Sequence, residues 1–400
     1  MTSSAVTIAG TGCVCAAGNS SAQAFAGAFG EAGRFLLPTQ RVNSSYAKSF
    51  PVFQVDERVV EACPQGHSMS LHFFLTAARE AFAQAGVLPQ EFLHKRVGVI
   101  VGTTVDASFH CLEVYGRWRK EQLTSQDVQE LSDYYHTSTA QTVSRLFGFT
   151  GPFQTVVTAC ASGTDAIGLA KGWIDSGLCD VVLCGGCDEI NIVPYDGFIR
   201  LLIASKEKCR PFSKNRNGIN IGEGAGALLL VSQQVRQEFH IHPQGYVLGY
   251  GNACDAYHPT APDPAAKGLS KAIEHALRQA GIGAAELAFI NAHATASQAN
   301  DLAESVAFRQ YLAQVPVWGS KGVTGHTLGA AGAVEAVLTL QALNKRQVPP
   351  TVGFEIYDES IGFSPTTQVT TITKRVALSN SLAFGGCNAA LVLGAQDYAY

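Results

Sequence analysis

The 400-residue sequence contains little charge: 15% of its residues are charged, and the formal net charge is −4. A chain without a basic excess lacks the field that attracts nucleic acid or an anionic membrane surface. It also lacks any apolar run of the roughly 20 residues that a bilayer-spanning helix requires. We therefore expect neither nucleic acid nor membrane among its partners.

The sequence shows no secretory leader, because residues 1–4 run directly into a strand-like segment at 5–10. Its 11 cysteines are too few for the disulfide framework of a small secreted domain. We expect a cytoplasmic protein with free thiols. The closely spaced cysteines at 13–15 and 184–187 lack a second pair at zinc-ligand spacing, and no third glycine completes a dinucleotide loop at 10–12. The sequence thus predicts no metal and no bound cofactor.

Short apolar strands alternate with amphipathic helices, which is typical of an α/β fold with helical crossovers between parallel strands. The hydrophobic content of 46% is ample for a large core. The expected strands are 5–10, 97–102, 154–158, 180–185, 225–231, 245–252, 287–292, 315–319, 376–380 and 389–393. The expected helices are 70–86, 126–147, 160–176, 263–281, 299–313 and 327–345, with loops at 205–217, 233–243 and 343–366.

One local pattern occurs twice along the chain. Segments 158–163 and 324–329 each follow an extended stretch and introduce a helix rich in small residues. The first carries Cys160 and the second carries His326. We interpret this as one βαβ theme used in two halves, 1–240 and 241–400, which would bring the two helix starts together.

Cys160 ends a β-branched run and lies at the expected start of a helix. Free N–H groups and the helix dipole at such a position favour negative charge, so we expect a lowered thiol pKa and a nucleophilic sulfur. A buried structural cysteine is the alternative. His293 ends a buried strand, and His326 lies among glycines five residues after Lys321. Two such histidines together with this cysteine favour catalysis.

These motifs, with Arg210-Pro211-Phe212 and Gly222-Glu223-Gly224-Ala225, resemble the beta-ketoacyl-acyl-carrier-protein synthases of the elongating type I/II kind. The resemblance extends to the ketosynthase subunits of type II polyketide systems and covers nearly the whole chain. It implies a thiolase fold, with two similar α/β halves in a five-layered αβαβα arrangement. It also implies a Cys-His-His triad at Cys160, His293 and His326.

The resemblance implies a role for each site residue. Cys160 would carry the acyl group, and the two histidines would stabilise the enolate left when a malonyl thioester loses carbon dioxide. Backbone N–H groups of Cys160 and Phe384 would form an oxyanion hole. Lys321 would support the second histidine, with Glu335 as its buried acidic partner; a pure salt-bridge role for Lys321 remains open.

Further residues are implied for substrate binding. Phe384 would gate the acyl pocket, and Gly385 and Gly386 would make that gate mobile. Val105 would lie near the acyl pocket. The remaining positions, where hydroxyl or amide groups would meet the phosphopantetheine arm of an acyl carrier protein, are Thr260, Thr295, Ser297 and Asn388.

The sequence departs from the family pattern at several positions. Ala294 and Ala383 replace glycines, and Ser213 replaces an aspartate, so we expect one structural ion pair to be missing. Segment 65–72 lacks the lysines and arginines that usually dock the acidic carrier. We expect docking at 117–120, at 206–210 or through a partner subunit. These departures favour a specialised polyketide or polyene pathway over housekeeping fatty-acid elongation.

Alternatives to a condensing enzyme remain open. One is a thiolase, since Cys387 lies in a suitable C-terminal loop. Another is a non-catalytic subunit like a chain-length factor, although Cys160 is retained. The chain is expected to act as a homodimer or as a heterodimer with a chain-length-factor-like subunit.

Overall fold

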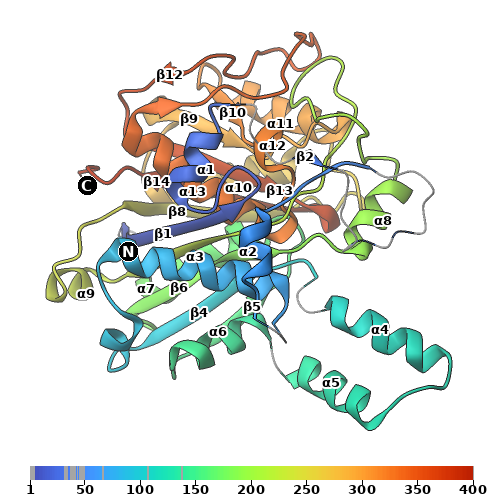
Figure 1. The fold of residues 1–400 in the computed structure, drawn as a ribbon. Helices are drawn as coiled ribbons and strands as arrows, with labels where there is room; N and C mark the ends of the chain where they lie inside the picture. Colours follow the sequence, from blue (N-terminus) through green and yellow to red (C-terminus); the bar gives the residue numbers. More distant parts are fainter. Residues whose placement is uncertain are drawn as a thin grey trace.

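The computed structural model describes residues 5–30, 35–36, 42, 44, 50–64, 67–105, 108–136 and 138–399. Ten of its strands are linked by hydrogen bonds in the order β10-β9-β13-β14-β8-β1-β7-β6-β4-β5 (Figure 1). The five from the first part of the chain are β1 (Val6–Cys15), β4 (Val97–Gly102), β5 (Phe153–Val156), β6 (Val181–Asp188) and β7 (Gly224–Val231). The five from the second part are β8 (Gly245–Cys254), β9 (Leu287–Ala292), β10 (Val317–Gly319), β13 (Val376–Leu382) and β14 (Cys387–Gly394).

The two groups of five strands share one topology. Strands β5, β4 and β6 pair in parallel, and β6, β7 and β1 continue antiparallel. Strands β10, β9 and β13 repeat the parallel part, and β13, β14 and β8 repeat the antiparallel part. The theme inferred from the segments before the two central helices is therefore present as a structural repeat. The division at residues 240 and 241 stays a prediction.

Helices cover both faces of each group, which explains why strands β6 and β7 are buried along their whole length and apolar except for Asp188 at the end of β6. Six helices form the helical layers: α3 (Met69–Ala85), α6 (Thr139–Phe147), α7 (Ser162–Asp175), α10 (Lys267–Ala280), α11 (Gln298–Tyr311) and α13 (Ala331–Lys345). Helices α3 and α6 pack on the first group, and α10 with α11 on the second. Helices α7 and α13 touch each other and contact strands of both groups. The result is five layers, αβαβα.

Small residues allow the central layer to close. A Cβ at Gly163, in α7, would lie 2.8 Å from the carbonyl oxygen of Gly329, and one at Gly226, in β7, would lie 2.5 Å from the carbonyl carbon of Ala333. Backbone therefore meets backbone where α7 and α13 begin. This close approach brings the segment that carries Cys160 against the segment that carries His326.

Several expected elements differ from those observed. The helix expected at 126–147 is two helices, α5 (Ser125–His136) and α6, because Ser138 caps α6 by accepting a hydrogen bond from the backbone N–H of Gln141. The helix expected at 327–345 opens with a 3₁₀ turn, η3 (Leu328–Ala330). Segments 233–243 and 343–366, expected as loops, contain α9 (Gln233–Glu238) and β11 (Gln347–Val348).

The sequence pattern missed two further helices, α4 (Ser108–Arg119) and α8 (Ile192–Arg200). Helices α4 and α5 contact each other and project from the body of the molecule (Figure 1). The other short elements are α1 (Ser21–Gly27), α2 (Glu57–Glu61), α12 (Lys321–Thr324), β2 (Phe35–Leu36), β3 (Val52–Phe53) and β12 (Thr370–Thr371). Within the described ranges, no helix has the length and apolar character needed to cross a membrane.

Candidate active site

Cys160 lies on a tight turn between β5 and α7. Ala159 before it adopts a positive φ of 50°, a conformation that costs a residue with a Cβ. The Ser162 hydroxyl donates to the Ala159 carbonyl at 2.6 Å and accepts from the Thr158 N–H at 2.9 Å, which holds the turn. The Cys160 side chain is buried, with 6% of the residue exposed, and the backbone N–H groups of Cys160 and Phe384 point at its sulfur.

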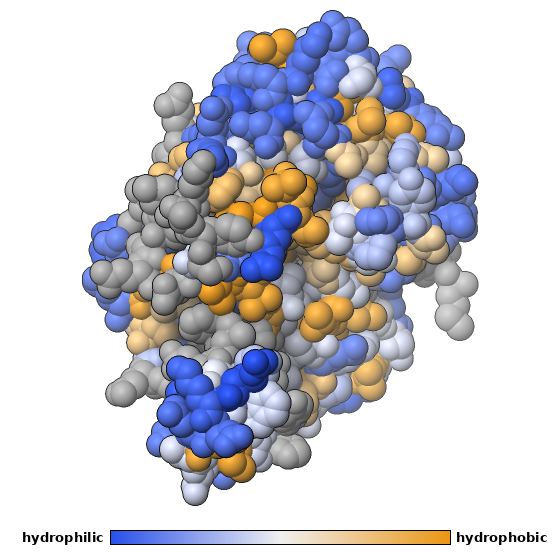
Figure 2. Space-filling view, turned by 90° about the vertical axis from the view of Figure 1, so that its right-hand side faces the viewer, coloured by the Kyte–Doolittle hydropathy of each residue, from blue (hydrophilic) through white to orange (hydrophobic). Residues whose placement is uncertain are grey.

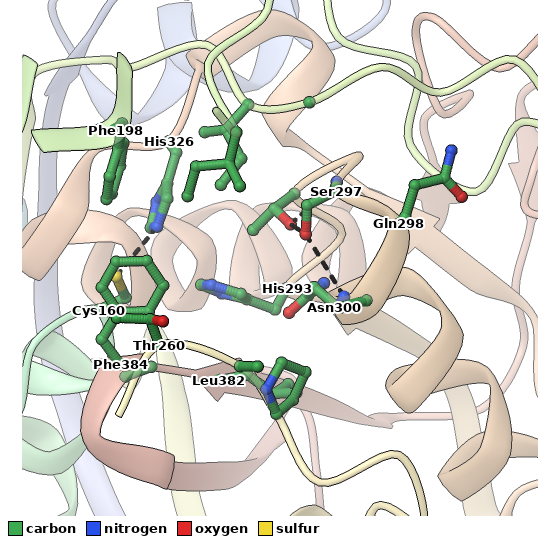
Figure 3. A pocket seen from close by; sticks show the side chains of 18 of the residues that line it. Cys160, Phe198, Thr260, His293, Ser297, Gln298, Asn300, His326, Leu382 and Phe384 are labelled. Carbon is green, nitrogen blue, oxygen red and sulfur yellow. Dashed lines mark hydrogen bonds between the residues drawn. The ribbon is translucent and has the colours of Figure 1, made fainter. Parts of the chain in front are cut away.

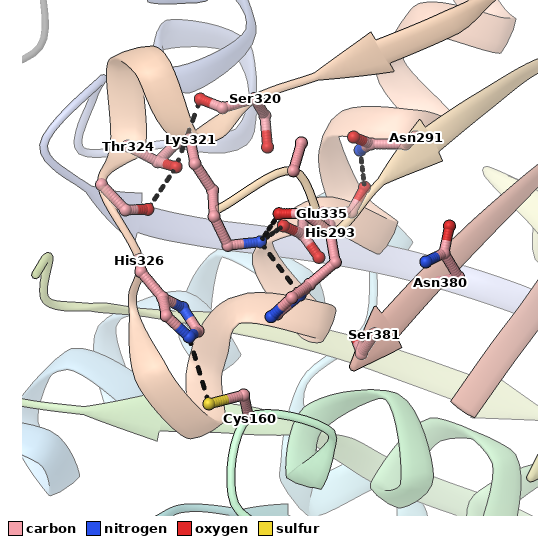
Figure 4. A network of polar contacts seen from close by, with 12 residues as sticks. Cys160, Asn291, His293, Ser320, Lys321, Thr324, His326, Glu335, Asn380 and Ser381 are labelled. Atoms are coloured by element: carbon pink, nitrogen blue, oxygen red, sulfur yellow. Dashed lines mark hydrogen bonds and ion pairs between the residues drawn. The ribbon is translucent and has the colours of Figure 1, made fainter. Parts of the chain in front are cut away.

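His326 reaches the same sulfur from the second half of the chain. Its backbone N–H donates to the carbonyl of Asn220 at 2.8 Å, and the residue forms a bridge to Ile221. Its Nε2 atom lies 3.1 Å from Sγ of Cys160 (Figure 4). Nδ1 of His326 has no hydrogen-bond partner among the described residues, so no contact ties this ring to one tautomer.

His293 follows the end of β9 and faces the other two residues. Its backbone N–H and that of Ala294 donate to the two oxygens of Glu304, each at 2.7 Å. The His293 and His326 rings are perpendicular, with centroids 5.0 Å apart. Ala294, where a glycine was expected, adopts a positive φ of 47°, so this alanine carries backbone strain that a glycine would not.

Lys321 holds His293 rather than His326, which corrects the sequence expectation. Its Nζ lies 3.2 Å from Nδ1 of His293, donates to the His293 carbonyl at 2.5 Å and pairs with Glu335 (Figure 4). An ammonium group only donates, so Nδ1 of His293 is the acceptor and its Nε2 carries the hydrogen. The expected pairing of Lys321 with Glu335 is present, and both side chains are 2% exposed.

The expectation of an ionised Cys160 is wrong for the resting protein. Burial raises the pKa of its thiol to about 12, although Lys321 and the two backbone N–H groups lower it in part. Burial and the nearby Lys321 charge also hold the pKa values of His293 and His326 well below the usual range. The resting site therefore contains a neutral thiol beside two neutral imidazoles. The helix start does not compensate for the loss of water around the sulfur.

The triad lies at the end of a largely apolar cavity of about 420 Å³ (Figure 3). Phe384 lines it and packs edge-on against Phe198 from α8, with ring centroids 5.6 Å apart. Phe198 also stacks over His326 at 6.2 Å. At the rim, Leu202 is 90% exposed. Figure 2 shows that apolar side chains gather near the middle of the face viewed, with hydrophilic ones above and below.

The structure brings most of the expected substrate-binding residues to this cavity. Thr260, Thr295, Ser297 and Asn388 line it. The Thr295 and Ser297 hydroxyls lie 3.1 Å apart, and Ser297 also caps α11. The Asn388 amide donates to Asp255 at 2.8 Å and to the Gly386 carbonyl at 3.0 Å, so it holds the neighbouring loop.

Three expected residues do not line the cavity. Gly385 and Gly386 follow Phe384 in the 3₁₀ turn η4 (Phe384–Gly386), with positive φ angles of 80° and 76°. The loop therefore requires glycine for its shape. The backbone N–H of Val105 lies 3.5 Å from a carboxylate oxygen of Asp188, away from the cavity lining.

The structure shows which contacts Ser213 makes where the family pattern has an aspartate. Arg216 is 4% exposed and lines the cavity, and it pairs with Asp358 from a distant loop. The Ser213 hydroxyl instead accepts the backbone N–H groups of Glu355 and Ile356 and so fixes that loop.

Sequence reasoning missed several residues that support the site. Phe198 was not found because Pro194 and Gly197 made the short segment of α8 resemble a loop. Asp188 is fully buried behind the cysteine and accepts from Thr103 at 2.7 Å and from the Gly329 N–H at 2.6 Å. Glu304, also fully buried, positions the His293 backbone. The available sequence signal for Asp188 was its position at the end of an apolar strand. The signal for Glu304 was an acidic residue within the helix expected at 299–313.

The sulfur and two imidazole nitrogens of the triad lie within 4.8 Å of one another, close enough to share a metal ion. Nδ1 of His293 is already engaged by Lys321, and the fixed positive charge of that lysine opposes a dication at this point. The arrangement fits thiol and imidazole chemistry, in which the sulfur attacks and the imidazoles transfer or donate hydrogen.

The architecture and the site define a thiolase-fold acyltransferase. Residues 4–235 match the family model described as "Beta-ketoacyl synthase, N-terminal domain", and residues 244–355 match "Beta-ketoacyl synthase, C-terminal domain". The chain belongs to the beta-ketoacyl synthase family, a family of enzymes. The family resemblance stated from the sequence motifs, and the thiolase fold that it implied, are confirmed.

Curated relatives carry consistent names. The chain is 37% identical over 337 residues to a "Putative 3-oxoacyl-[acyl-carrier-protein] synthase, mitochondrial" of Schizosaccharomyces pombe, which covers 79% of each chain. It is 33% identical over 334 residues to a "3-oxoacyl-[acyl-carrier-protein] synthase 2" of Synechocystis, with 80% of each chain covered.

Solved structures extend the similarity to polyketide systems. "The ishigamide ketosynthase/chain length factor" superposes with a TM-score of 0.90 at 28% identity and covers 99% of both chains. A type II polyketide acyl-carrier protein in complex with its ketosynthase bound to the hexaketide superposes with a TM-score of 0.87 at 25% identity, covering 98% of this chain and 99% of that one.

Proposed function

We propose that this chain condenses an acyl group on Cys160 with a malonyl thioester carried by an acyl carrier protein, giving a 3-oxoacyl thioester and carbon dioxide. The observation that supports this most directly is the 3.1 Å contact between Sγ of Cys160 and Nε2 of His326, with His293 perpendicular to it at the end of the cavity. One nucleophile and two imidazoles match the needs of the two half-reactions.

In the first half-reaction, the acyl group moves from the carrier to the enzyme. Because the Cys160 thiol is neutral at rest, its proton passes to Nε2 of His326 as the sulfur attacks the thioester carbonyl. The carbon–sulfur bond to the carrier then breaks, and the departing pantetheine sulfur takes that proton from His326. The tetrahedral oxyanion would accept hydrogen bonds from the backbone N–H groups of Cys160 and Phe384, a proposal supported by their position beside the Cys160 sulfur.

In the second half-reaction, a malonyl thioester loses carbon dioxide. The electron pair of the broken carbon–carbon bond forms an enolate, whose oxygen accepts from Nε2–H of His293 and Nε2–H of His326. Lys321 keeps the hydrogen of His293 on Nε2, whereas His326 is free to change tautomer once the sulfur is acylated. The enolate carbon attacks the acyl carbonyl, the bond to Cys160 breaks, and the released thiolate takes up a proton from water, so that one proton is consumed for each carbon dioxide released.

The cavity would hold the phosphopantetheine arm, the only prosthetic group that the proposal needs, and it would arrive with the carrier. Hydroxyl groups of Thr260, Thr295 and Ser297 line the path to the triad. Phe384 separates that path from the acyl side, and Asn388 holds the loop after the gate. Val105 lies outside the cavity and remains the proposed marker of the acyl pocket on the other side of the gate.

We infer a specialised type II polyketide, polyene or fatty-acid pathway in the cytoplasm. Support comes from the similarity to "The ishigamide ketosynthase/chain length factor" and to a carrier-bound polyketide ketosynthase. The partners would be an acyl carrier protein and either a second copy or a chain-length-factor-like subunit. Carrier docking is proposed at 206–210, beside the cavity rim. Segment 65–72 lacks lysine and arginine, and its residues 65 and 66 lie outside the described part of the chain.

Cys387 does not favour a thiolase, because it lies outside the cavity lining. The retained and buried Cys160 beside His326 likewise opposes a purely structural subunit. The test is to incubate the protein with acyl- and malonyl-carrier protein and to measure the 3-oxoacyl product and the mass of the tryptic peptide 146–171. Product and an acylated Cys160 peptide are expected, and both disappear in Cys160→Ala. Coenzyme A-dependent cleavage of a 3-oxoacyl thioester without condensation would instead establish a thiolase, and an unmodified peptide would establish a structural subunit.

A further inference from the structure

Cys254 and Cys387 lie opposite each other at the ends of neighbouring antiparallel strands. They are register partners in the pairing of β8 with β14. Both are free cysteines; Cys254 is exposed and Cys387 is half-buried. Neither belongs to the triad or lines its cavity.

The local hydrogen bonding places this pair at the closer kind of cross-strand site. The backbone N–H of Asp255 donates to the carbonyl of Gly386 at 2.8 Å, which is one of the two bonds of a hydrogen-bonded pair, while the Gly386 N–H donates to the Ala383 carbonyl at 3.2 Å. Pairs alternate along an antiparallel ladder, so 254 and 387 form a non-hydrogen-bonded pair, in which Cα atoms lie about 4.5 Å apart. That separation falls within the range of roughly 4.4–6.8 Å that a disulfide spans.

Both sulfur atoms lie beside the loop that follows the gating phenylalanine. Sγ of Cys254 lies 3.6 Å from the carbonyl oxygen of Gly385. A Cβ built on Gly385 would lie 4.0 Å from Sγ of Cys387. The backbone N–H of Gly385 also donates to the Pro259 carbonyl at 2.7 Å, which ties this loop to the segment after Cys254. A covalent bond between the two cysteines would join the end of β8 to the start of β14, and Gly385 lies close to both sulfur atoms.

We propose that Cys254 and Cys387 form a reversible disulfide that immobilises the Phe384 gate and slows turnover under oxidising conditions. The oxidant is a peroxide. Its outer oxygen adds to one thiol sulfur, giving a sulfenic acid and water; the second thiol then displaces that oxygen as another water and forms the sulfur–sulfur bond. A dithiol reverses the modification by exchange.

The environment of the pair sets the order of the two steps. Burial raises the pKa of Cys387, and the carboxylates of Asp165 and Asp255 raise it further. Cys254 is open to solvent, so peroxide reaches it first, and the shielded Cys387 resolves the sulfenic acid. The catalytic Cys160 is 6% exposed with a pKa raised to about 12, which protects it from the same oxidant.

The sequence makes the bond directly measurable. Trypsin places Cys254, Cys387 and Cys160 in three peptides, 237–267, 376–400 and 146–171, each with a single cysteine. After stoichiometric peroxide treatment, digestion without reductant should yield the 237–267 and 376–400 peptides joined, and dithiothreitol should separate them. Failure to find the joined peptides, while each carries a sulfinic or sulfonic acid or remains unmodified, would overturn the proposal.

The effect on the gate is a separate measurement, and it rests on the proposed condensing activity. Oxidised protein should lose at least half of its condensation rate and regain it with dithiothreitol, whereas Cys254→Ser and Cys387→Ser should keep theirs. The control variant Cys63→Ser removes another partly accessible thiol and should respond to peroxide as the protein without substitutions does. A joined peptide with unchanged turnover would refute gating. Absence of activity in reduced protein would instead count against the proposed function, because the peptide measurement does not depend on it.

Discussion

Nζ of Lys321 lies 3.2 Å from Nδ1 of His293, and the same ammonium group pairs with Glu335. The two histidines of the triad are therefore not equivalent. Lys321 fixes His293 as a hydrogen-bond donor toward the cavity, whereas His326 contacts the sulfur and keeps its Nδ1 free of any described partner. We propose from this asymmetry that His293 acts only in stabilising the enolate, whereas His326 also transfers the proton at the sulfur.

Replacing Lys321 tests whether its role is catalytic positioning or only a salt bridge. Lys321→Met leaves the Glu335 carboxylate buried without a partner, so stability falls together with the rate of malonyl decarboxylation, the latter by about 100-fold. The double variant Lys321→Met, Glu335→Leu removes both charges and should recover the melting temperature. Decarboxylation should stay low in the double variant. Recovery of both quantities would show that the lysine is only a structural ion.

The two histidine variants should separate the half-reactions. His326→Ala removes the base at 3.1 Å from the sulfur, so acylation of Cys160 should slow by about 100-fold or more. His293→Ala leaves that contact intact and should acylate at a similar rate while decarboxylation collapses. Mass spectrometry of the 146–171 peptide over time measures the first step, and release of labelled carbon dioxide measures the second. Equal effects of both variants on both steps would contradict the asymmetry.

The buried sulfur should show a distinctive pH profile. Because the pKa of Cys160 is raised to about 12, its thiolate fraction is small at pH 7 and grows tenfold with each pH unit. The rate of alkylation by iodoacetamide should therefore rise from pH 7 to pH 10 without a plateau. The peptide that contains Cys254 provides the internal comparison. A plateau near neutral pH would mean that the thiolate exists at rest as an ion pair with His326.

The gate loop offers a matched pair of substitutions. Gly385 has a φ of 80° and open space around its missing Cβ, so Gly385→Ala should cost about 1 kcal/mol through backbone strain alone. Ala383 has an extended backbone, with φ −138° and ψ 156°, so Ala383→Gly introduces freedom without relieving strain. Thermal unfolding should show a lower stability for both variants. Product analysis should show a slower gate in the first variant and a broader range of chain lengths in the second.

The Arg216–Asp358 pair predicts a pH-dependent stability. The guanidinium lowers the pKa of Asp358 to about 2, from an ordinary value near 3.8. A carboxylate with a lowered pKa stabilises the fold above about pH 4, by at most about 2 kcal/mol, and this contribution disappears as the pH falls through 2. Asp358→Asn should therefore lower the free energy of unfolding at pH 7 and leave it nearly unchanged at pH 2. An equal deficit at both pH values would assign the loss to packing.

Local pattern determined a large part of the site. The sequence placed Cys160 after a β-branched run, His293 at the end of a buried strand and His326 among glycines, and each pattern reflects requirements within a few residues. In the structure β5 ends at Val156 and β9 at Ala292, just before these side chains. The pairing of Lys321 with Glu335 was also anticipated. Expected roles remain predictions, but the positions of these side chains in the structure agree with them.

Errors arose where the answer depended on residues far apart in the chain. Lys321 contacts His293, 28 residues earlier in the chain, rather than the nearby His326. Helix α8 escaped detection although Tyr195, Phe198 and Ile199 follow helical spacing, because Pro194 and Gly197 in this nine-residue segment are typical of a turn. The contact of Lys321 with His293 is not encoded in a window of ten or fifteen residues.

By itself, the sequence determined the α/β class, because strand and helix periodicity are local, and its resemblance to a known family implied the thiolase fold and the three triad groups. Only the tertiary structure decided the protonation state of Cys160, the inequality of the two histidines and the opposition of Cys254 to Cys387. Desolvation, tautomer choice and cross-strand register depend on what surrounds a group in three dimensions, and that environment is assembled from both halves of the chain.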